Sequence, residues 1–87
     1  MKPRMTFEEH VEMGLGLARL RDELVHRTVQ LSNAYPKSGP ESVPAQRLEK
    51  ALNAIDKARS ELEDMLYGEH QEQAGTSVYY PQRENRR

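Results

Sequence analysis

One segment of the sequence carries a carboxylate and an imidazole at the spacing used by dinuclear metal bundles. Glu23 and His26 stand three residues apart, which places both side chains on one face of a helix, within reach of the same ion. A carboxylate-bridged site also needs further inward-facing carboxylates, and the second half of the chain contains no second Glu-x-x-His unit. We therefore predict no metal site and no bound cofactor.

The remaining residues offer no catalytic arrangement. His10 and His70 stand beside glutamates and are expected to be solvated. No Ser-His-Asp order, glycine-rich phosphate loop or pair of buried carboxylates can be assembled, because the acidic residues fall on outward faces of the expected helices. The absence of cysteine excludes disulfides, thiolate zinc sites and a cysteine nucleophile. We expect a protein that is not an enzyme and infer no small-molecule substrate.

A second pattern overlaps the first. Arg21 and His26, in Arg21-Asp22-Glu23-Leu24-Val25-His26, resemble the Arg-x4-His signature of the HEPN ribonucleases and their inactive relatives, which are all-helical dimers of toxin–antitoxin and defence systems. The resemblance covers six residues. It implies phosphate stabilisation by Arg21 and general acid/base catalysis by His26 at a dimer cleft. A minimal HEPN-like ribonuclease, or an inactive relative, is therefore one alternative function, although that family has more helices than this chain can form.

Length and composition limit the fold to one small domain. The chain has 87 residues, of which 31% are charged and 36% hydrophobic, so its core must be modest. No stretch approaches the roughly 18 to 20 apolar residues of a membrane span, and the mean hydropathy is -0.93. The basic start turns acidic where a secretory signal would become apolar. We therefore expect a soluble, cytoplasmic protein without membrane contact.

The net charge of -1 hides basic ends around an acidic body. Such a body is a poor general surface for nucleic acid, although either end can contact phosphate. A nucleic-acid-binding accessory protein that uses its basic termini is a second alternative function. Near the C-terminus, aromatic and basic residues can stack on bases and bind phosphate, or dock on a partner protein. These candidate contact residues are Tyr79, Tyr80, Arg83, Arg86 and Arg87.

Local signals delimit two helices. Thr6 and Glu9 form a capping box that predicts a helix start, and Pro36 ends that helix, giving residues 6–35. Ser42 is a plausible N-cap, Pro44 suits a first turn, and Gly68 is placed as a C-cap. The predicted organisation is a basic arm at 1–5, a helical hairpin at 6–68 with a turn at 36–43 and a second helix at 44–67, and a polar tail at 69–87.

Both predicted helices are amphipathic. The first helix has two apolar stripes, and Gly14 and Gly16 within it favour close packing against a neighbour. One stripe contains Met13, Leu17, Leu20, Leu24, Leu31 and Tyr35, and the other contains Phe7, Val11, Ala18, Val25 and Val29. The second helix has one narrow stripe of Leu48, Ala51, Leu52, Ile55, Ala58, Leu62, Met65 and Leu66. Arg59 lies within this stripe, and its head group is expected to reach water.

A two-helix hairpin has no interior and needs a partner to bury its remaining apolar surface. The simplest partner is a second copy, so we expect an all-α antiparallel hairpin that dimerises into a coiled-coil-like four-helix bundle. Another protein is the alternative partner. The predicted function is a small non-enzymatic interaction module: an adaptor, a regulator or an accessory protein of a phage or mobile element. The predicted association seam is Phe7, Val11, Ala18, Val25, Val29, Leu52, Ile55, Arg59, Leu62 and Leu66.

Overall fold

Between residues 4 and 81 the chain forms two long helices and two short ones. The computed structural model describes residues 4–81. Its elements are α1 (Phe7–Ala34), the 3-10 helix η1 (Pro40–Ser42), α2 (Val43–Glu69) and α3 (Thr76–Tyr79). The described residues form no strand, so the prediction of an all-α protein is confirmed. None of these helices contains an apolar stretch that could cross a bilayer.

The predicted capping box starts α1. The Thr6 hydroxyl accepts from the backbone N–H of Glu9 at 3.1 Å, and the Glu9 carboxylate accepts from the backbone N–H of Thr6 at 2.8 Å. These two bonds satisfy amides that a helix start leaves without partners. At the other end, Tyr35 is extended, as expected for a residue before proline.

The turn between α1 and α2 and the C-terminal end of α2 differ from the prediction. Gly39 has a φ of 80°, the left-handed region that favours glycine. Ser42 occupies the N-cap position of α2, but its hydroxyl donates to the Gly39 carbonyl at 2.7 Å and caps no α2 amide. The prediction that Gly68 ends the helix is wrong, because α2 continues through Glu69 and His70 is the C-cap.

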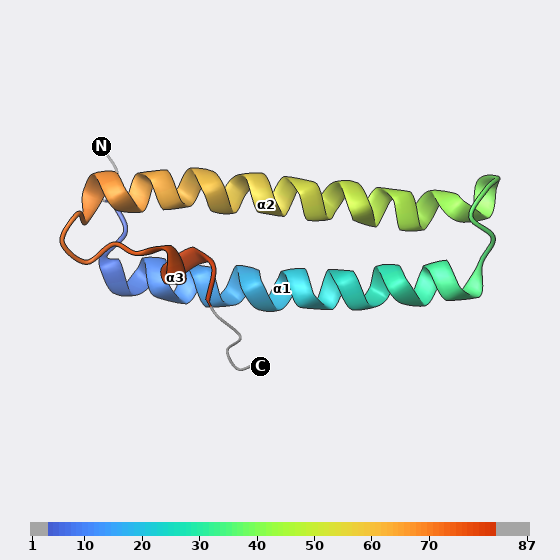
Figure 1. The fold of residues 1–87 in the computed structure, drawn as a ribbon, viewed down its shortest axis with the longest axis horizontal. Coiled ribbons are helices and arrows are strands. Elements are labelled where there is room, and N and C mark those ends of the chain that lie inside the picture. Colours follow the sequence, from blue (N-terminus) through green and yellow to red (C-terminus); the bar gives the residue numbers. More distant parts are fainter. Residues whose placement is uncertain (1–3, 82–87) are drawn as a thin grey trace.

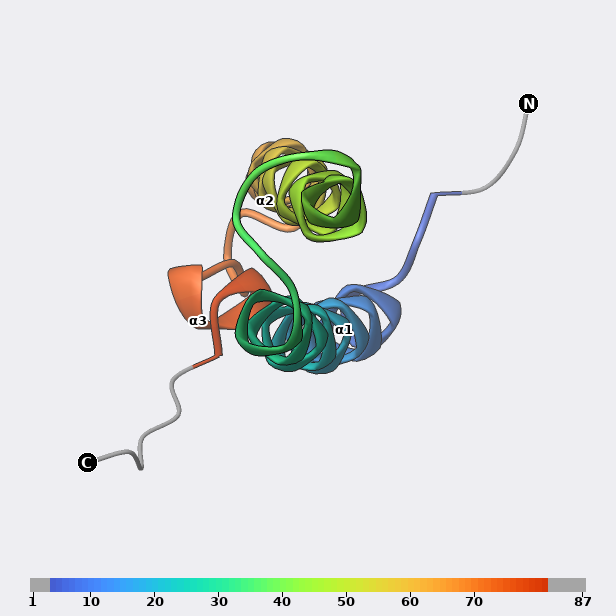
Figure 2. The ribbon, with the colours of Figure 1, turned by 90° about the vertical axis from the view of Figure 1, so that its right-hand side faces the viewer.

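The two long helices lie side by side and run in opposite directions (Figure 1). After α2 the chain turns back, and α3 packs against both α1 and α2. Seen along the helices, α3 lies on one side of the pair, and the segment that leads into α1 lies on the other (Figure 2). One face of the α1–α2 pair is therefore partly covered, whereas no described element crosses the opposite face.

The core is thin. Among the described residues, the only apolar side chains classed as buried are Leu66 and Tyr79, both 0% exposed. Six members of the predicted seam are only half-buried: Phe7, Val11, Ala18, Leu52, Ile55 and Leu62. Val25 and Val29 are 37% and 51% exposed. Packing between α1 and α2 thus leaves much apolar surface in contact with water.

The two glycines of α1 have different surroundings. Gly14 is buried against α3, and a Cβ atom there would clash with the Val78 carbonyl and lie 2.9 Å from its carbon. The predicted close packing therefore involves the backbone of α3. Gly16 is exposed, and a Cβ atom would meet nothing within 4 Å among the described residues.

This contrast provides a matched pair of substitutions. Gly14→Ala should push α3 away from α1 and lower the free energy of unfolding by about 1 to 3 kcal/mol, the usual cost of overpacking. Gly16→Ala should raise it by up to about 1 kcal/mol, because alanine favours the helix. Denaturant unfolding followed by circular dichroism measures both. Equal effects of the two substitutions would contradict the close approach of α3.

Candidate functional site

Tyr79 anchors α3 through its side-chain hydroxyl and its backbone carbonyl. The side chain is fully buried, and its hydroxyl lies 2.6 Å from Nδ1 of His10. Its backbone carbonyl accepts from Nε and Nη2 of Arg59 at 2.9 and 2.7 Å. A segment expected to be mostly polar tail is therefore attached to both long helices.

His10 connects this anchor to the end of α2. Its Nε2 lies 3.1 Å from Oε1 of Glu69. An ionised carboxylate can only accept, so Nε2 carries the proton and Nδ1 accepts from the Tyr79 hydroxyl. Burial raises the pKa of the Tyr79 phenol, and the Glu69 carboxylate raises it further, which keeps the hydroxyl protonated as a donor.

His70 completes a compact polar cluster at the same end. Its Nε2 donates to the Met5 carbonyl at 2.9 Å, and its ring meets that of His10 edge-on, with centroids 5.6 Å apart. One nitrogen from each histidine and a carboxylate oxygen of Glu69 all lie within 4.8 Å of one another. We call His10, Glu69 and His70 the His–Glu–His cluster.

The expectation that these histidines are solvated is wrong. His10 is fully buried and His70 is half-buried, because the continuation of α2 beyond Gly68 brings Glu69 and His70 to the start of α1. The local sequence contains one signal that was missed. Gly14 follows His10 by four residues and so shares its helix face, which leaves room beside the imidazole for another segment.

Arg59 also departs from the prediction. Its side chain does not reach water: the residue is 8% exposed. Besides its two bonds to Tyr79, its Nη1 lies 3.6 Å from the Asp56 carboxylate, and its guanidinium carbon lies 4.5 Å from the Tyr80 ring centroid. The buried charge is thus held by a carbonyl, a carboxylate and an aromatic face, which together offset its desolvation.

The residues of the two sequence patterns do not form a common site. Arg21 makes a two-bond pair with Asp56, at 2.8 and 3.2 Å. His26 is exposed and lies about 140° from Arg21 around the helix axis, given 3.6 residues per turn. Glu23 accepts from Arg27 at 2.8 Å on the exposed face. Arg21 and His26 therefore lie on different sides of α1, and Glu23 is paired with Arg27.

The candidate contact residues predicted in the tail differ in their burial, and some lie outside the described residues. Tyr79 is buried, whereas Tyr80 is 36% exposed beside Arg59. Arg83, Arg86 and Arg87 lie outside the described residues. The structure therefore assigns Tyr79 a packing role.

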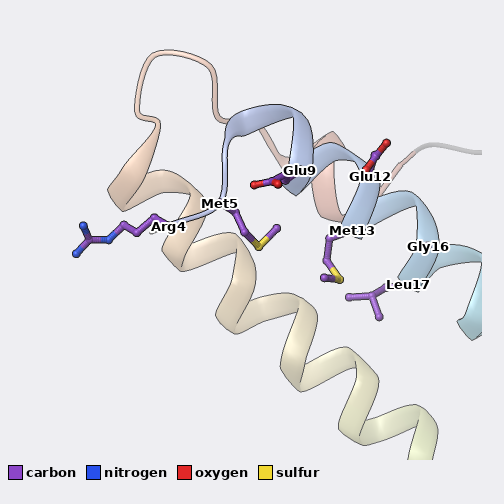
Figure 3. Close-up of a pocket in the computed structure, with 7 residues that line it drawn as sticks. All are labelled: Arg4, Met5, Glu9, Glu12, Met13, Gly16 and Leu17. Atoms are coloured by element: carbon purple, nitrogen blue, oxygen red, sulfur yellow. The ribbon is translucent and has the colours of Figure 1, made fainter. Parts of the chain in front are cut away.

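A second candidate surface lies on the side away from α3. A surface hollow at the start of α1 is lined by the apolar side chains of Met5, Met13 and Leu17, with Glu9 and Glu12 at its rim (Figure 3). On α2, Met65 lines an adjacent hollow that also includes Met5. Both long helices thus contribute apolar side chains to this side.

From this hollow, apolar residues continue along both helices at the alternating three- and four-residue spacing of a coiled coil. We define the open apolar face by Met13, Leu17, Leu20, Leu24 and Leu31 of α1 and by Ala51, Ile55, Ala58, Leu62 and Met65 of α2. All ten are half-buried or exposed. Met13, Leu20 and Met65 are 40%, 47% and 49% exposed. These values mark a face that α1–α2 packing leaves unfilled.

The anchoring role of the Tyr79 hydroxyl can be tested directly. Tyr79→Phe retains the ring but removes the only described donor to Nδ1 of buried His10. An unsatisfied buried polar atom costs about 1 to 3 kcal/mol, and the free energy of unfolding should fall by this amount. The control is Tyr80→Phe at the exposed neighbouring position, where a change within about 0.5 kcal/mol is expected. Equal losses in the two variants would argue against the His10 bond.

The Arg21–Asp56 pair predicts an acid-dependent contribution to stability. The hydrogen bond from Arg21 is the main cause that lowers the pKa of Asp56 below its ordinary 3.8. Since the folded value is the lower one, the stabilisation is fully present above pH 3.8 and is lost as pH falls through the folded value. The pair is partly exposed, so it should contribute less than about 1 kcal/mol.

Asp56→Asn should therefore lower stability at neutral pH and reduce the slope of the stability–pH curve below pH 3.8. Denaturant unfolding at a series of pH values measures that slope. Asp64→Asn, at an exposed position of the same helix, is the control and should leave the slope nearly unchanged. An unaltered slope in Asp56→Asn would show that the pair contributes nothing measurable.

Comparisons with known proteins identify no relative. No protein-family model, curated protein or solved structure matches the chain. The function must therefore be inferred from the chain's own surfaces, of which the His–Glu–His cluster and the open apolar face are the two most distinctive.

Proposed function

We propose that this protein is a non-enzymatic interaction module, an antiparallel helical hairpin that forms a homodimer through its open apolar face. The observation that carries the proposal is the exposure of coiled-coil positions on both long helices, including Met13, Leu20 and Met65. A second hairpin laid on this face would complete a four-helix bundle. On α1 the proposed interface differs from the predicted seam, because α3 packs beside Gly14 on the other side of α1, whereas Ile55 and Leu62 of α2 belong to both.

The charges along the helices favour one orientation of the second copy. At one end of the pair, residues 7–18 and 60–69 contain seven Asp or Glu residues and no Lys or Arg. Towards the other end, residues 19–34 and 43–59 contain seven Lys or Arg residues and four Asp or Glu residues. A copy laid antiparallel places each acidic end over a basic end, whereas a parallel copy places like charges together.

This orientation also suits the residues near the middle of each helix. In the antiparallel dimer the two-fold axis lies in the interface and runs across the middle of α1 and α2. It therefore brings Leu20 close to Leu20 of the second copy. On α2, Ala51 and Ala58 lie on the same face, and such small side chains allow close approach of two helices. The dimer then leaves α3 outside the interface.

The alternative functions are less well supported by the contacts. The Arg21 guanidinium is bound to Asp56, so a HEPN-like role would require that pair to break. RNA cleavage lost in His26→Ala would establish that role instead. For nucleic-acid binding through the termini, replacement of Arg83, Arg86 and Arg87 by alanine would have to abolish a salt-dependent affinity. A cytoplasmic adaptor or regulator, including a phage or mobile-element accessory protein, fits the proposed module.

Charge placed on the open face tests the dimer. Leu20→Glu should convert the protein to a monomer of about 10 kDa by light scattering, because a carboxylate would be buried without a partner. Val29→Glu, at an exposed position of the other stripe of α1, is the matched control and should remain a dimer. Dissociation by Val29→Glu alone would place the interface on the predicted seam, and a monomeric wild type would reject the homodimer.

A single cysteine tests the orientation. The natural chain has no cysteine, so the only thiol in Leu20→Cys is the introduced one. In the antiparallel dimer the two thiols lie near the two-fold axis, and mild oxidation should give a disulfide-linked dimer on a non-reducing gel. Glu12→Cys lies far from that axis and should cross-link much less. Equal cross-linking by Leu20→Cys and Glu12→Cys would contradict the assigned orientation.

A further inference from the structure

We infer that the His–Glu–His cluster is a binding site for a divalent transition-metal ion of the zinc type, at the end of the α1–α2 pair where α3 attaches. The cluster draws one ligand from α1, one from α2 and one from the residue that caps α2. Two imidazoles and one carboxylate are the protein ligands of many open zinc sites. This site borders the open apolar face at Met65, which lines the same hollow as Glu69 and His70, but its ligands do not belong to that face and the inference does not rest on the proposed dimer.

The spacing of the ligand atoms suits a metal ion. Metal–ligand bonds of about 2.0 to 2.2 Å in tetrahedral geometry place neighbouring ligand atoms roughly 3.4 Å apart. Nε2 of His10 and Oε1 of Glu69 already lie 3.1 Å apart, and His10, Glu69 and His70 each offer one ligand atom within 4.8 Å of the other two. His70 is half-buried at the helix end, so a small rotation of its side chain can close the remaining gap.

Both imidazoles also have a partner at the second ring nitrogen, as metal-binding histidines usually do. Nε2 of His70 donates to the Met5 carbonyl, which fixes the tautomer whose Nδ1 carries a lone pair. Nδ1 of His10 lies 2.6 Å from the Tyr79 hydroxyl. Binding of an ion at Nε2 of His10 would require the ring proton to move from Nε2 to Nδ1, and the Tyr79 hydroxyl would then change from donor to acceptor of this hydrogen bond.

The surroundings favour a cation and allow it to enter. Glu69 and His70 line a surface hollow together with Arg4, Met5, Met65 and Gly68, so an ion can reach these two side chains from solvent. The helix segments at this end carry seven carboxylates and no lysine or arginine. Arg4 approaches Glu69 only at 3.8 Å and is largely exposed, so it can move away. Imidazole ligands favour zinc-type ions over Mg²⁺ or Ca²⁺.

Titration calorimetry of the untagged full-length protein with Zn²⁺ tests the site. We expect one Zn²⁺ per chain, with affinity reduced at least tenfold in His70→Gln and Glu69→Gln. Tyr79→Phe should weaken binding about 10- to 100-fold, the usual effect of losing a hydrogen bond to a metal ligand. The matched control is His26→Gln, which removes the exposed histidine of α1 and should leave both affinity and stoichiometry unchanged.

Two further readouts separate site binding from loss of fold. Circular dichroism should show wild-type helicity for His70→Gln, whose side chain is only half-buried. Zn²⁺ should raise the melting temperature of the wild type but not of His70→Gln. Co²⁺ should give the intense visible absorption of a tetrahedral site in the wild type and His26→Gln only. Absence of Zn²⁺ binding by the wild type, or an equal loss in His26→Gln and His70→Gln, would overturn the assignment.

Discussion

The burial of Tyr79 between α1 and α2 is the interaction on which the rest of the structure depends. Two helices alone bury little, and Leu66 is the only other apolar residue that is fully buried in the described part. An aromatic ring contributes a large apolar area, and both polar groups of Tyr79 have partners, His10 at the hydroxyl and Arg59 at the carbonyl. Removing this residue would leave an imidazole and a guanidinium buried without those partners.

This arrangement makes the molecule asymmetric. The attachment of α3 requires Gly14, because any larger residue there meets the Val78 backbone. The helix α3 therefore covers the side of α1 that carries Gly14, and the coiled-coil positions around Leu20 stay exposed. The same asymmetry separates a polar end, where Glu69 and His10 meet, from a long apolar face. A binding surface and a candidate ion site thus lie next to each other in one small domain, and Met65 lines the hollow at their border.

The sequence predicts the structural features that depend on neighbouring residues. It does not predict the contacts between residues that lie far apart in the chain. The capping box of Thr6 and Glu9 is a local signal, and so is the apolar spacing that predicts two long helices. The His10–Tyr79 bond joins residues 69 positions apart, and no local pattern specifies it. Arg59 was expected to reach water, as arginines in apolar stripes commonly do. Its actual partner is the Tyr79 carbonyl, in a segment whose composition indicates a tail.

Burial of the His–Glu–His cluster costs free energy, and this cost bears on the role of the cluster. His10 is completely buried, and an apolar ring at this position would fill the space without requiring Tyr79 and Glu69 as partners. Buried polar groups of this kind are often no more stabilising than apolar residues of similar volume. In the structure, a single hydrogen bond to Glu69 occupies Nε2 of His10. A divalent ion would engage that nitrogen together with Glu69 and His70, joining the start of α1 to the end of α2. Binding energy would then offset the cost of burying the cluster.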